Sequence, residues 1–305
     1  MNLSAQLIGY PRIGPKRELK WALEQAWSGR MDPAAFAERA SELRRDHLDE
    51  QRGLLGSAVD DFFLYDEVLE TALMLGLVPD AVIGEPFEIL TALARGTSER
   101  EAWEMTKWFD TNYHYVVPEV EQLPERLQPM WWRQPLEGGD TTWSILGPYS
   151  FVKLSKLAPG LDFVQVAAAI GSAVGAWARE QGSTFRLQLD EPCLGMVLSD
   201  ADLRLLDAAY EAMGDPGLAS PAIVTVGTRR PIRSSRSAGA AWRCRWRSTG
   251  SSRSGGLRDG SLSRRTSWRS WTAAVCGRTT LQVPSASWRA WTTTGGRSSS
   301  CRRRA

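Results

Sequence analysis

Histidine and cysteine are scarce in this sequence, and their scarcity limits the chemistry that the chain can carry. The two histidines and four cysteines are His47, His114, Cys193, Cys244, Cys276 and Cys301. The cysteines are too widely spaced for a zinc site, and His47 is expected on the polar side of a helix. The strings GxGxxG, GxxxxGK(S/T) and GxSxG are also absent. A dinucleotide site, a P-loop and a serine hydrolase are therefore poor hypotheses.

Long apolar runs are absent as well. The longest run of small apolar residues, VQVAAAIGSAVGAWA, is about 15 residues long, which is shorter than the roughly 20 that a membrane helix needs. The N-terminal string MNLSAQLIGYPRIG has no basic region followed by an apolar one, so it does not resemble a signal peptide. Residues 1–228 contain only Cys193, which excludes a disulfide framework there. These absences predict a soluble cytoplasmic protein that does not bind membranes.

Lysine is missing from residues 229–305, here called the C-terminal segment. The segment holds 18 arginines and a single acid, Asp259, so its charge is +17 although the whole chain carries only +2. Its 6 tryptophans and 16 serines follow no period, and it has too few aliphatic residues to bury a core. An Arg/Trp segment of this kind could bind nucleic acid. Out-of-frame translation of GC-rich DNA is the favoured explanation, because a basic surface does not require arginine alone. We expect the segment to be disordered.

Residues 1–228 show the patterns of a protein that mixes helices and strands. Apolar residues at helical spacing predict helices over residues 15–28, 60–79, 87–96, 99–109, 162–182 and 199–214. A further helix is predicted to begin at Asp32-Pro33 and to carry Phe36, Ala40, Leu43 and Leu48 on one face. Short β-rich runs predict strands within residues 4–14, 141–146, 184–191 and 222–227. The alternation of strand and helix implies an α/β fold with parallel strands. Carboxylates at a strand end favour a (β/α) barrel.

The string PRIGPKRELK places cations where a helix begins. If Pro15 starts the helix, Lys16, Arg17 and Lys20 lie in its first turns and oppose the helix dipole. The cost is a few tenths of a kcal/mol for each charge. A polyanionic ligand would offset it, because backbone N–H groups and basic side chains would both favour carboxylates or phosphates. A solvated helix start with Glu18 as ion partner is the alternative.

The string WEMTKWFDTNYHYVVPE surrounds Lys107, Asp110 and Asn112 with aromatic side chains. Aromatic faces beside amide and hydroxyl groups suit a flat heteroaromatic ligand. A core helix that runs into an aromatic turn explains the same composition. Both interpretations remain open at this point.

The string LQLDEPCL ends a predicted strand with Asp190 and Glu191. Barrel enzymes place acids, bases and ligands at such strand ends. Strand alternation turns only one of the two carboxylates toward a barrel axis. A structural carboxylate that bonds to neighbouring loops is the alternative.

Several strings together resemble the N-terminal domain of cobalamin-independent methionine synthase, the 5-methyltetrahydropteroyltriglutamate–homocysteine methyltransferases. They are GYPRIGPKRELKWALEQAWSG, DDFFLYDEVLETALMLGLVP, MTKWFDTNYHYVVPE, ILGPYSFVKLSK and LDEPCL, in this order. The resemblance covers roughly residues 3–228. It implies an incomplete (β/α)8 TIM-type barrel over residues 1–228, followed by the C-terminal segment over residues 229–305.

The resemblance also implies a function and a set of binding residues. The family transfers a methyl group from 5-methyltetrahydropteroyltri-L-glutamate to homocysteine, with zinc and without cobalamin. Its zinc ligands and catalytic residues lie in a second, C-terminal barrel that nothing in this sequence matches, so Asp190 and Glu191 are expected to be structural. The folate-binding residues implied for this chain are Arg17, Glu18, Leu19, Lys20 and Lys107. We expect a chain that is inactive alone. The alternatives are a free-standing accessory protein that binds folate polyglutamate and, less favoured, a nucleic-acid-binding protein.

Overall fold

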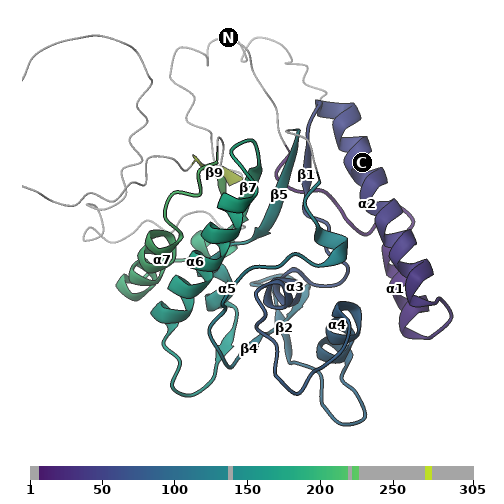
Figure 1. The fold of residues 1–305 in the computed structure, drawn as a ribbon, viewed down its shortest axis with the longest axis horizontal. Helices are drawn as coiled ribbons and strands as arrows, with labels where there is room; N and C mark the ends of the chain where they lie inside the picture. Colours follow the sequence, from purple (N-terminus) through teal and green to yellow (C-terminus); the bar gives the residue numbers. More distant parts are fainter. Residues whose placement is uncertain (1–6, 137–139, 219–221, 227–271, 277–305) are drawn as a thin grey trace, which may run out of the picture.

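The main structural feature is a parallel sheet flanked by helices. A computed structural model describes residues 7–136, 140–218, 222–226 and 272–276. Side by side in the sheet lie β1 (Ala58–Asp60), β5 (Thr141–Leu146), β7 (Arg186–Asp190), β8 (Ala222–Val226) and β9 (Thr272–Cys276), all parallel. The predicted α/β class is confirmed (Figure 1). The described strands do not close into a barrel, since β1 and β9 form the two edges of the sheet.

Helices cover the sheet from both sides. They are α1 (Glu18–Trp27), α2 (Pro33–Leu55), α3 (Glu67–Met74), α4 (Pro86–Arg95), α5 (Pro148–Lys153), α6 (Phe163–Glu180) and α7 (Asp200–Met213). Short 3-10 turns span Trp131–Arg133 and Pro192–Gly195. Figure 1 shows α6 and α7 on one side of the strands, and α1 and α2 on the other. None of the helices in the described ranges is long and apolar enough to cross a membrane.

Local capping explains why the helices begin where the sequence predicts. The Asp32 carboxylate accepts hydrogen bonds from the backbone N–H groups of Ala34 and Ala35, both at 3.0 Å, and Pro33 occupies the first turn of α2. Asp162 caps α6 in the same way, and Ser199 forms a capping box with the third residue of α7. The predictions for α2, α6 and α7 are therefore confirmed to within a few residues.

The helix predicted over residues 99–109 is wrong. This stretch contains β2 (Met105–Lys107), which pairs antiparallel with β3 (His114–Val116). The backbone N–H of Trp103 donates to Leu93 at 2.9 Å, which holds the extended chain against α4. Aromatic side chains fit a strand as well as a helix, and the pairing partner decides between the two.

Two short parallel strands, β4 (Glu119–Val120) and β6 (Lys156–Leu157), form a third sheet.

The helix predicted over residues 60–79 is shorter than expected. β1 ends at Asp60, and α3 begins only at Glu67. Asp66 caps α3 by accepting a hydrogen bond from the backbone N–H of Leu69 at 2.9 Å. Residues 61–66 therefore form a loop at the carboxyl end of β1. Residues 7–14 of the first predicted strand are not in a strand, and the rest of that prediction lies outside the described residues.

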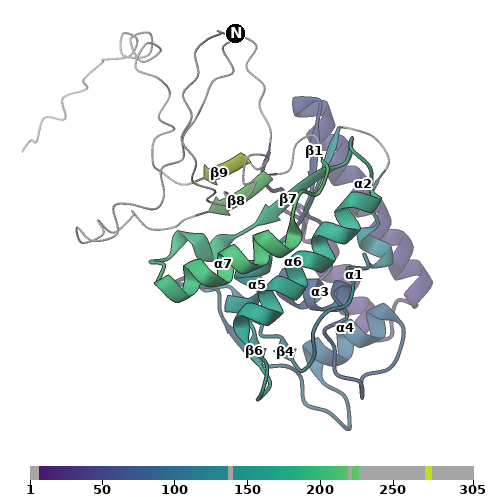
Figure 2. The ribbon, with the colours of Figure 1, turned by 60° about the vertical axis from the view of Figure 1, so that its left-hand side comes forward.

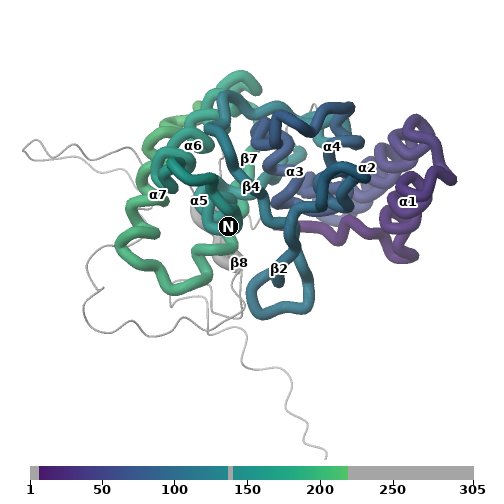
Figure 3. The backbone as a smooth tube through the Cα atoms, turned by 90° about the horizontal axis from the view of Figure 1, so that it is seen from below, coloured from purple at the N-terminus to yellow at the C-terminus, as the bar shows by residue number. Residues whose placement is uncertain are grey.

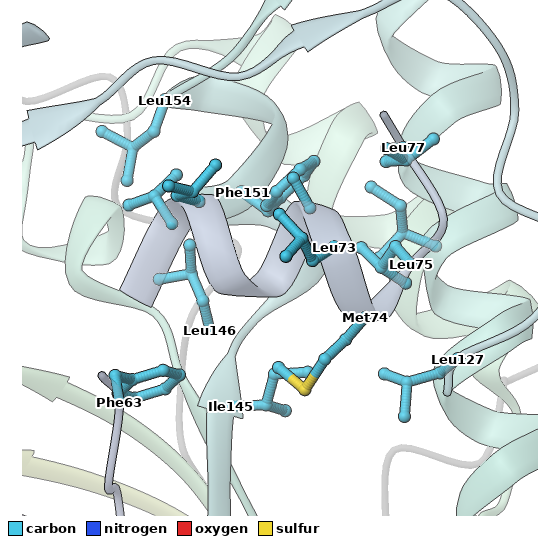
Figure 4. Packing of buried hydrophobic residues seen from close by; sticks show 14 of the residues in the cluster. Phe63, Leu73, Met74, Leu75, Leu77, Leu127, Ile145, Leu146, Phe151 and Leu154 are labelled. Atoms are coloured by element: carbon cyan, nitrogen blue, oxygen red, sulfur yellow. The ribbon is translucent and has the colours of Figure 1, made fainter. Parts of the chain in front are cut away.

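α3 occupies the centre of the hydrophobic core. Figure 4 shows Leu73 and Met74 of α3 beside Ile145 of β5 and Phe151 of α5. All four side chains are buried and belong to one continuous cluster. Burying each contributes about 1.5–3 kcal/mol. This packing fixes α3, and with it the loop that precedes α3, relative to the strand ends.

α6 and α7 pack closely because α6 has glycines at the contact (Figure 2). A Cβ added at Gly171 would overlap the carbonyl oxygen of Ala209, and one at Gly175 would overlap that of Met213. The small-residue face of α6 therefore lets the two backbones approach each other directly. The packed pair covers one face of the sheet between β7 and β8.

Replacing Gly171 by Val is expected to lower the free energy of unfolding by about 1–3 kcal/mol, because the new side chain must push α7 away. Urea denaturation followed by circular dichroism measures the change. The matched control is Gly53→Ala in α2, where Gly53 is exposed and an added Cβ meets nothing within 4 Å. That control should be neutral or stabilising by about 0.5–1 kcal/mol. Equal effects of the two substitutions would rule out the proposed close approach.

Most of the C-terminal segment lies outside the described residues. The predicted disorder of this segment therefore concerns residues that the structure does not describe. The described exception is β9, whose Thr272 and Cys276 pair with Ala222 and Val226 of β8. The predicted strand over residues 222–227 is confirmed as β8. The predicted nucleic-acid contact of the segment also concerns residues that the structure does not describe.

Candidate functional site

Two strands of the sheet, β1 and β7, each have two consecutive acidic residues at their carboxyl ends, which lie on the same side of the sheet. β1 ends with Asp60 and is followed by Asp61, and β7 ends with Asp190 and is followed by Glu191. Parallel strands place their carboxyl ends together, and β5 lies between β1 and β7. The four carboxylates divide into two that serve the fold and two that line a pocket.

Asp60 belongs to a buried ion network. Its carboxylate receives hydrogen bonds from the guanidinium group of Arg44. The guanidinium group of Arg133 lies 3.6 Å from its other oxygen, and both Asp60 and Arg133 side chains are fully buried. Buried charges need such partners, because an unpaired one costs several kcal/mol. Asp60 therefore serves the fold.

Glu191 joins β7 to two helices. It accepts hydrogen bonds from the backbone N–H groups of Tyr149 at 3.1 Å and Ser150 at 2.7 Å, at the N-terminus of α5. The Tyr210 hydroxyl of α7 donates to it at 2.8 Å. Burial raises the pKa of Glu191 to about 7, although these donors favour its charged form. A Cβ at Gly147 would overlap this carboxylate, so the position next to it must be glycine. All of these contacts are those of a structural carboxylate.

Asp190 is held by neighbouring strand residues but faces a cavity. The Ser144 hydroxyl of β5 donates to one of its oxygens, and the Gln188 amide donates to the other at 2.9 Å. Gln188 also donates to the carbonyl of Ile8 at 2.8 Å, which ties the N-terminal loop to the sheet. Asp190 therefore has a fixed orientation at the edge of the pocket described next.

A pocket of about 400 Å³ lies at the carboxyl edge of the sheet and is called here the acidic pocket. Its lining residues are Tyr10, Pro11, Arg12, Asp61, Phe63, Asp66, Glu67, Val68, Trp108, Tyr113 and Asp190. They come from the N-terminal loop, the β1–α3 loop, the start of α3, the β2–β3 hairpin and the end of β7. Its volume lies in the range of small-molecule sites.

The carboxylates of the acidic pocket have raised pKa values. Burial raises the pKa of Asp61, Asp66 and Asp190 to about 6 each. Burial, and then the charges of Asp190 and Asp61, raise the pKa of Glu67 well above its usual range. Burial thus favours the uncharged form of Glu67, while Asp61, Asp66 and Asp190 titrate near pH 6.

Arg12 is the single arginine among the described residues of the acidic pocket, and its guanidinium group donates hydrogen bonds to backbone carbonyl oxygens. Arg12 donates to the carbonyl oxygens of Phe63 at 3.3 Å, Leu64 at 3.4 Å and Tyr65 at 2.6 Å. These bonds fix the N-terminal loop over the β1–α3 loop. The backbone N–H of Tyr10 adds a bond of 2.8 Å to Asp61. The loop thus forms one wall of the pocket.

The β2–β3 hairpin forms another wall and projects from the body of the molecule (Figure 3). The Tyr113 hydroxyl donates to Asp66 at 3.3 Å. The ring of Trp108 lies edge-on to that of Tyr113, with centroids 6.5 Å apart. The aromatic string singled out in the sequence therefore contributes rings to a pocket, as one of its two interpretations requires.

The predicted binding residues of the RELK string lie at the N-terminus of α1, where Arg17 precedes the helix and Glu18, Leu19 and Lys20 form its first turn. α1 begins at Glu18, and Arg17 is the N-cap residue with φ 65°, in the left-handed region. Arg17 is exposed. The Glu18 carboxylate accepts a hydrogen bond from the backbone N–H of Lys16 at 2.9 Å, so it stabilises the turn before the helix. The predicted start at Pro15 is wrong by one turn.

The other three predicted binding residues have different environments. Leu19 is fully buried in the core, which gives it a packing role. Nζ of Lys20 lies 3.6 Å from Oε1 of Glu24 in the same helix, so the two side chains form an ion pair. Lys107 is exposed at the end of β2, opposite His114. None of the three lines the acidic pocket, and neither do Arg17 and Glu18.

His47 was expected on the polar side of its helix, and that expectation is wrong. It is 8% exposed, and its ring lies 5.4 Å from that of Tyr10 and 5.9 Å from that of Phe62. The N-terminal loop covers this side of α2, a contact that helical periodicity does not reveal. Burial lowers the pKa of His47.

Zinc is implied by the resemblance, but the described residues do not fit it. Among them, no group of three or more His, Cys, Asp or Glu side chains could hold a metal ion. Cys193 is buried, and burial raises the pKa of its thiol to about 12. A cysteine that binds zinc must do so as a thiolate, which this raised pKa disfavours. No chemical step through zinc is therefore assigned to this part of the chain.

Comparison with known proteins identifies the chain's relatives. Residues 4–225 match the family model described as "Cobalamin-independent synthase, N-terminal domain". The chain is 37% identical over 231 residues to a 5-methyltetrahydropteroyltriglutamate–homocysteine methyltransferase of Herpetosiphon aurantiacus, covering 71% of this chain and 30% of the relative. It is 38% identical over 229 residues to the protein of that name from Streptomyces griseus, covering 69% and 30%.

A plant relative gives a similar match. The chain is 34% identical over 239 residues to the chloroplastic 5-methyltetrahydropteroyltriglutamate–homocysteine methyltransferase 3 of Arabidopsis thaliana. The match covers 69% of this chain and 28% of the relative. The chain thus spans about 30% of the length of the known relatives it matches. The matched region includes the strands, helices and loops that build the carboxyl edge of the sheet. The chain belongs to the cobalamin-independent methionine synthase family, and residues 4–225 correspond to its N-terminal domain.

Proposed function

We propose that this chain is the folate-binding part of a methyltransferase that makes methionine from homocysteine and 5-methyltetrahydropteroyltri-L-glutamate. In this proposal Arg17, Lys20 and Lys107 bind the carboxylates of the triglutamate tail. Glu18 and Leu19 orient the basic side chains at the start of α1, the first through its bond to the loop and the second through the core. The names of the relatives support the reaction and the substrate.

The exposed cation at the N-terminus of α1 carries this proposal. Arg17 is exposed in a left-handed conformation directly before the helix, and within the described part of the chain it forms no ion pair. A left-handed arginine is unfavourable by about 1 kcal/mol or more, and a cation at this end opposes the helix dipole. An anionic ligand would use the positive end of the dipole together with the guanidinium group.

The remaining parts of the reaction are assigned to a separate barrel. We propose that the sheet described here belongs to an incomplete (β/α)8 barrel over residues 1–228, and that residues 229–305 are an out-of-frame sequence. The homocysteine thiolate and its zinc would be held by a C-terminal barrel, so this chain is expected to bind folate but not to transfer the methyl group alone.

The test is calorimetric titration of the full chain with 5-methyltetrahydropteroyltriglutamate and with the monoglutamate. The triglutamate should bind about 10-fold more tightly at low salt, because its additional carboxylates reach the basic side chains. Arg17→Ala and Lys107→Ala should each weaken triglutamate binding about 10-fold, as expected for a lost hydrogen bond to a charged group. Monoglutamate binding should change less.

The control removes the same charge from a distant surface. Arg204 is exposed on α7, on the other side of the sheet from α1 (Figure 1), and Arg204→Ala should leave both affinities unchanged. Equal affinity for triglutamate and monoglutamate would contradict the proposal, as would unchanged triglutamate binding in both variants. Methyl transfer by the chain alone would contradict the assignment of the chemistry to a separate barrel.

A further inference from the structure

The acidic pocket contains a buried oxygen atom without a partner. Oε1 of Glu67 is closed off from solvent and accepts no hydrogen bond within the part of the chain that the structure describes. Glu67 lines the pocket, where its carboxyl group feels the charges of Asp190 and Asp61. An unsatisfied buried acceptor costs about 1–3 kcal/mol. A donor supplied by a ligand would remove that cost.

The charge of the acidic pocket also favours a donor that is cationic. Asp61, Asp66 and Asp190 contribute carboxylates, and among the residues that the structure describes Arg12 contributes the one cation of the lining. Arg12 already donates to three backbone carbonyls, so its hydrogen-bonding capacity is largely used. The lining therefore has several acceptors that face the cavity and few donors. A bound cation would also reduce the repulsion between the carboxylates.

The shape of the acidic pocket favours a flat organic group over an ion. Tyr10, Phe63, Trp108 and Tyr113 bring four aromatic rings to a cavity of about 400 Å³. Cations with delocalised charge pack well against such rings. A bare metal ion would leave most of this volume unfilled. Among the described residues, no cluster of three or more His, Cys, Asp or Glu side chains is arranged so that it could hold a metal ion.

We propose that the acidic pocket binds a small, flat organic cation with several N–H donors, of the amidinium or guanidinium class. The donors would bond to Glu67 and to the adjacent carboxylates of Asp61 and Asp190, and the flat body would lie against Trp108 and Tyr113. The proposal is independent of the proposed triglutamate site, because Arg17 and Lys107 do not line this pocket.

The test uses benzamidine as the cationic probe and benzamide as its neutral isostere. Calorimetry on the full chain at pH 7.5 should give saturable binding of benzamidine, with a dissociation constant on the order of 1 mM for so small a ligand. Benzamide should bind at least 10-fold more weakly. Absence of saturable benzamidine binding would overturn the proposal, and so would equal affinity for the two compounds.

Two variants locate the binding. Glu67→Gln and Asp190→Asn keep the size of each side chain and remove its ability to become charged, and each should weaken benzamidine binding at least 10-fold. The matched control is Glu180→Gln at the exposed end of α6, which should leave the affinity unchanged. Circular dichroism confirms that each variant is folded. Unchanged binding in both pocket variants would place the probe elsewhere and overturn the assignment.

Proton release provides a readout that adventitious binding would not give. The charged groups that act on Glu67 are Asp190, Asp61, Asp66 and Arg133, and burial raises the pKa of its carboxyl group. A cation bound beside these acids lowers their pKa values, so protons pass to the buffer. Benzamidine binding should therefore appear more exothermic in Tris than in phosphate. Equal heats in the two buffers would contradict direct contact with the buried carboxyl groups of the pocket.

Discussion

Replacing Arg133 by Met is expected to lower the free energy of unfolding by about 3–5 kcal/mol. Arg133 is fully buried, and its guanidinium group donates to the carbonyl oxygens of Asp60 at 2.9 Å, Phe62 at 3.4 Å and Ser144. These carbonyls lie at the end of β1, within β5 and in the loop that follows β1. Methionine fills a similar volume but leaves the carbonyls without a donor. It also leaves Asp60 with Arg44 as its ion partner.

The rings around Arg133 add to this expected loss. Its guanidinium carbon lies 4.3 Å from the ring centroid of Phe63 and 4.8 Å from that of Trp143. A desolvated cation–π contact contributes up to about 2 kcal/mol. Burial lowers the pKa of Arg133, yet the Asp60 charge favours the cation. The side chain therefore acts as a charged connection between β1 and β5, and an apolar substitute cannot replace it.

Urea denaturation at pH 7 measures the effect, and Arg52→Met is the matched control. Arg52 pairs with Asp49 at 2.9 Å and Asp140 at 3.0 Å, but its side chain is 28% exposed. Partly exposed ion pairs contribute about 0–1 kcal/mol. A loss for Arg133→Met no greater than that for Arg52→Met would contradict the role assigned to Arg133. A loss of about 5 kcal/mol would leave a domain of ordinary stability only marginally folded.

The sequence predicts helices well where their boundaries are set by neighbouring residues. α2 begins at the string Asp32-Pro33, and α6 begins after Asp162, because capping acts within three residues. The predicted helix over residues 99–109 fails for the opposite reason. Its residues become β2 because β3 is available as a partner, with Met105 opposite Val116. Such pairing is a tertiary effect, which periodicity within one segment does not contain.

The candidate pocket was only partly predictable. Asp190 was identified as a carboxylate at a strand end, and the aromatic string was identified as a possible ring-lined site. Asp61 and Glu67 were missed because both fell within one predicted helix. The string AVDD, whose last residue is Asp61, resembles LQLDE, a short apolar run that ends in two acids, and could have indicated a second strand end. Their meeting with Asp190 depends on the order of strands in the sheet, which the sequence does not specify.

The protein is expected to become less stable as the pH rises from about 5 to 8. Burial raises the folded-state pKa of Asp61, Asp66 and Asp190 to about 6, and that of Glu191 to about 7. In the unfolded chain these groups titrate near their ordinary values of about 3.9 for Asp and 4.3 for Glu. Between those values and the raised ones the folded state holds more protons. The free energy of unfolding therefore falls as the pH increases through this window.

The size of the fall follows from the size of the shifts. A shift of about two pH units corresponds to about 2.7 kcal/mol for one group. Asp61 and Asp190 influence each other, so the four contributions are not additive, and we expect a total of at least about 3 kcal/mol between pH 5 and pH 8. Because the pKa of His47 is lowered, this group alone would make the free energy of unfolding increase with pH below about pH 6.5. Its contribution is smaller than the combined contribution of the four carboxyl groups. The pKa of Asp202 is held low, chiefly by Lys153, so Asp202 contributes stability that is lost only in stronger acid.

Urea denaturation at pH 5, 6, 7 and 8 tests this expectation, with two variants that separate its causes. Glu191→Gln keeps an acceptor for the backbone of α5 but cannot titrate, so it should reduce the fall in stability between pH 5 and pH 8. Glu211→Gln, at an exposed position of α7, should leave the profile unchanged. A flat profile, or one that rises with pH, would mean that these carboxylates are solvated in the folded protein. That result would also remove the electrostatic argument for a cation in the acidic pocket, because the same burial that raises these pKa values makes a positively charged ligand favourable there.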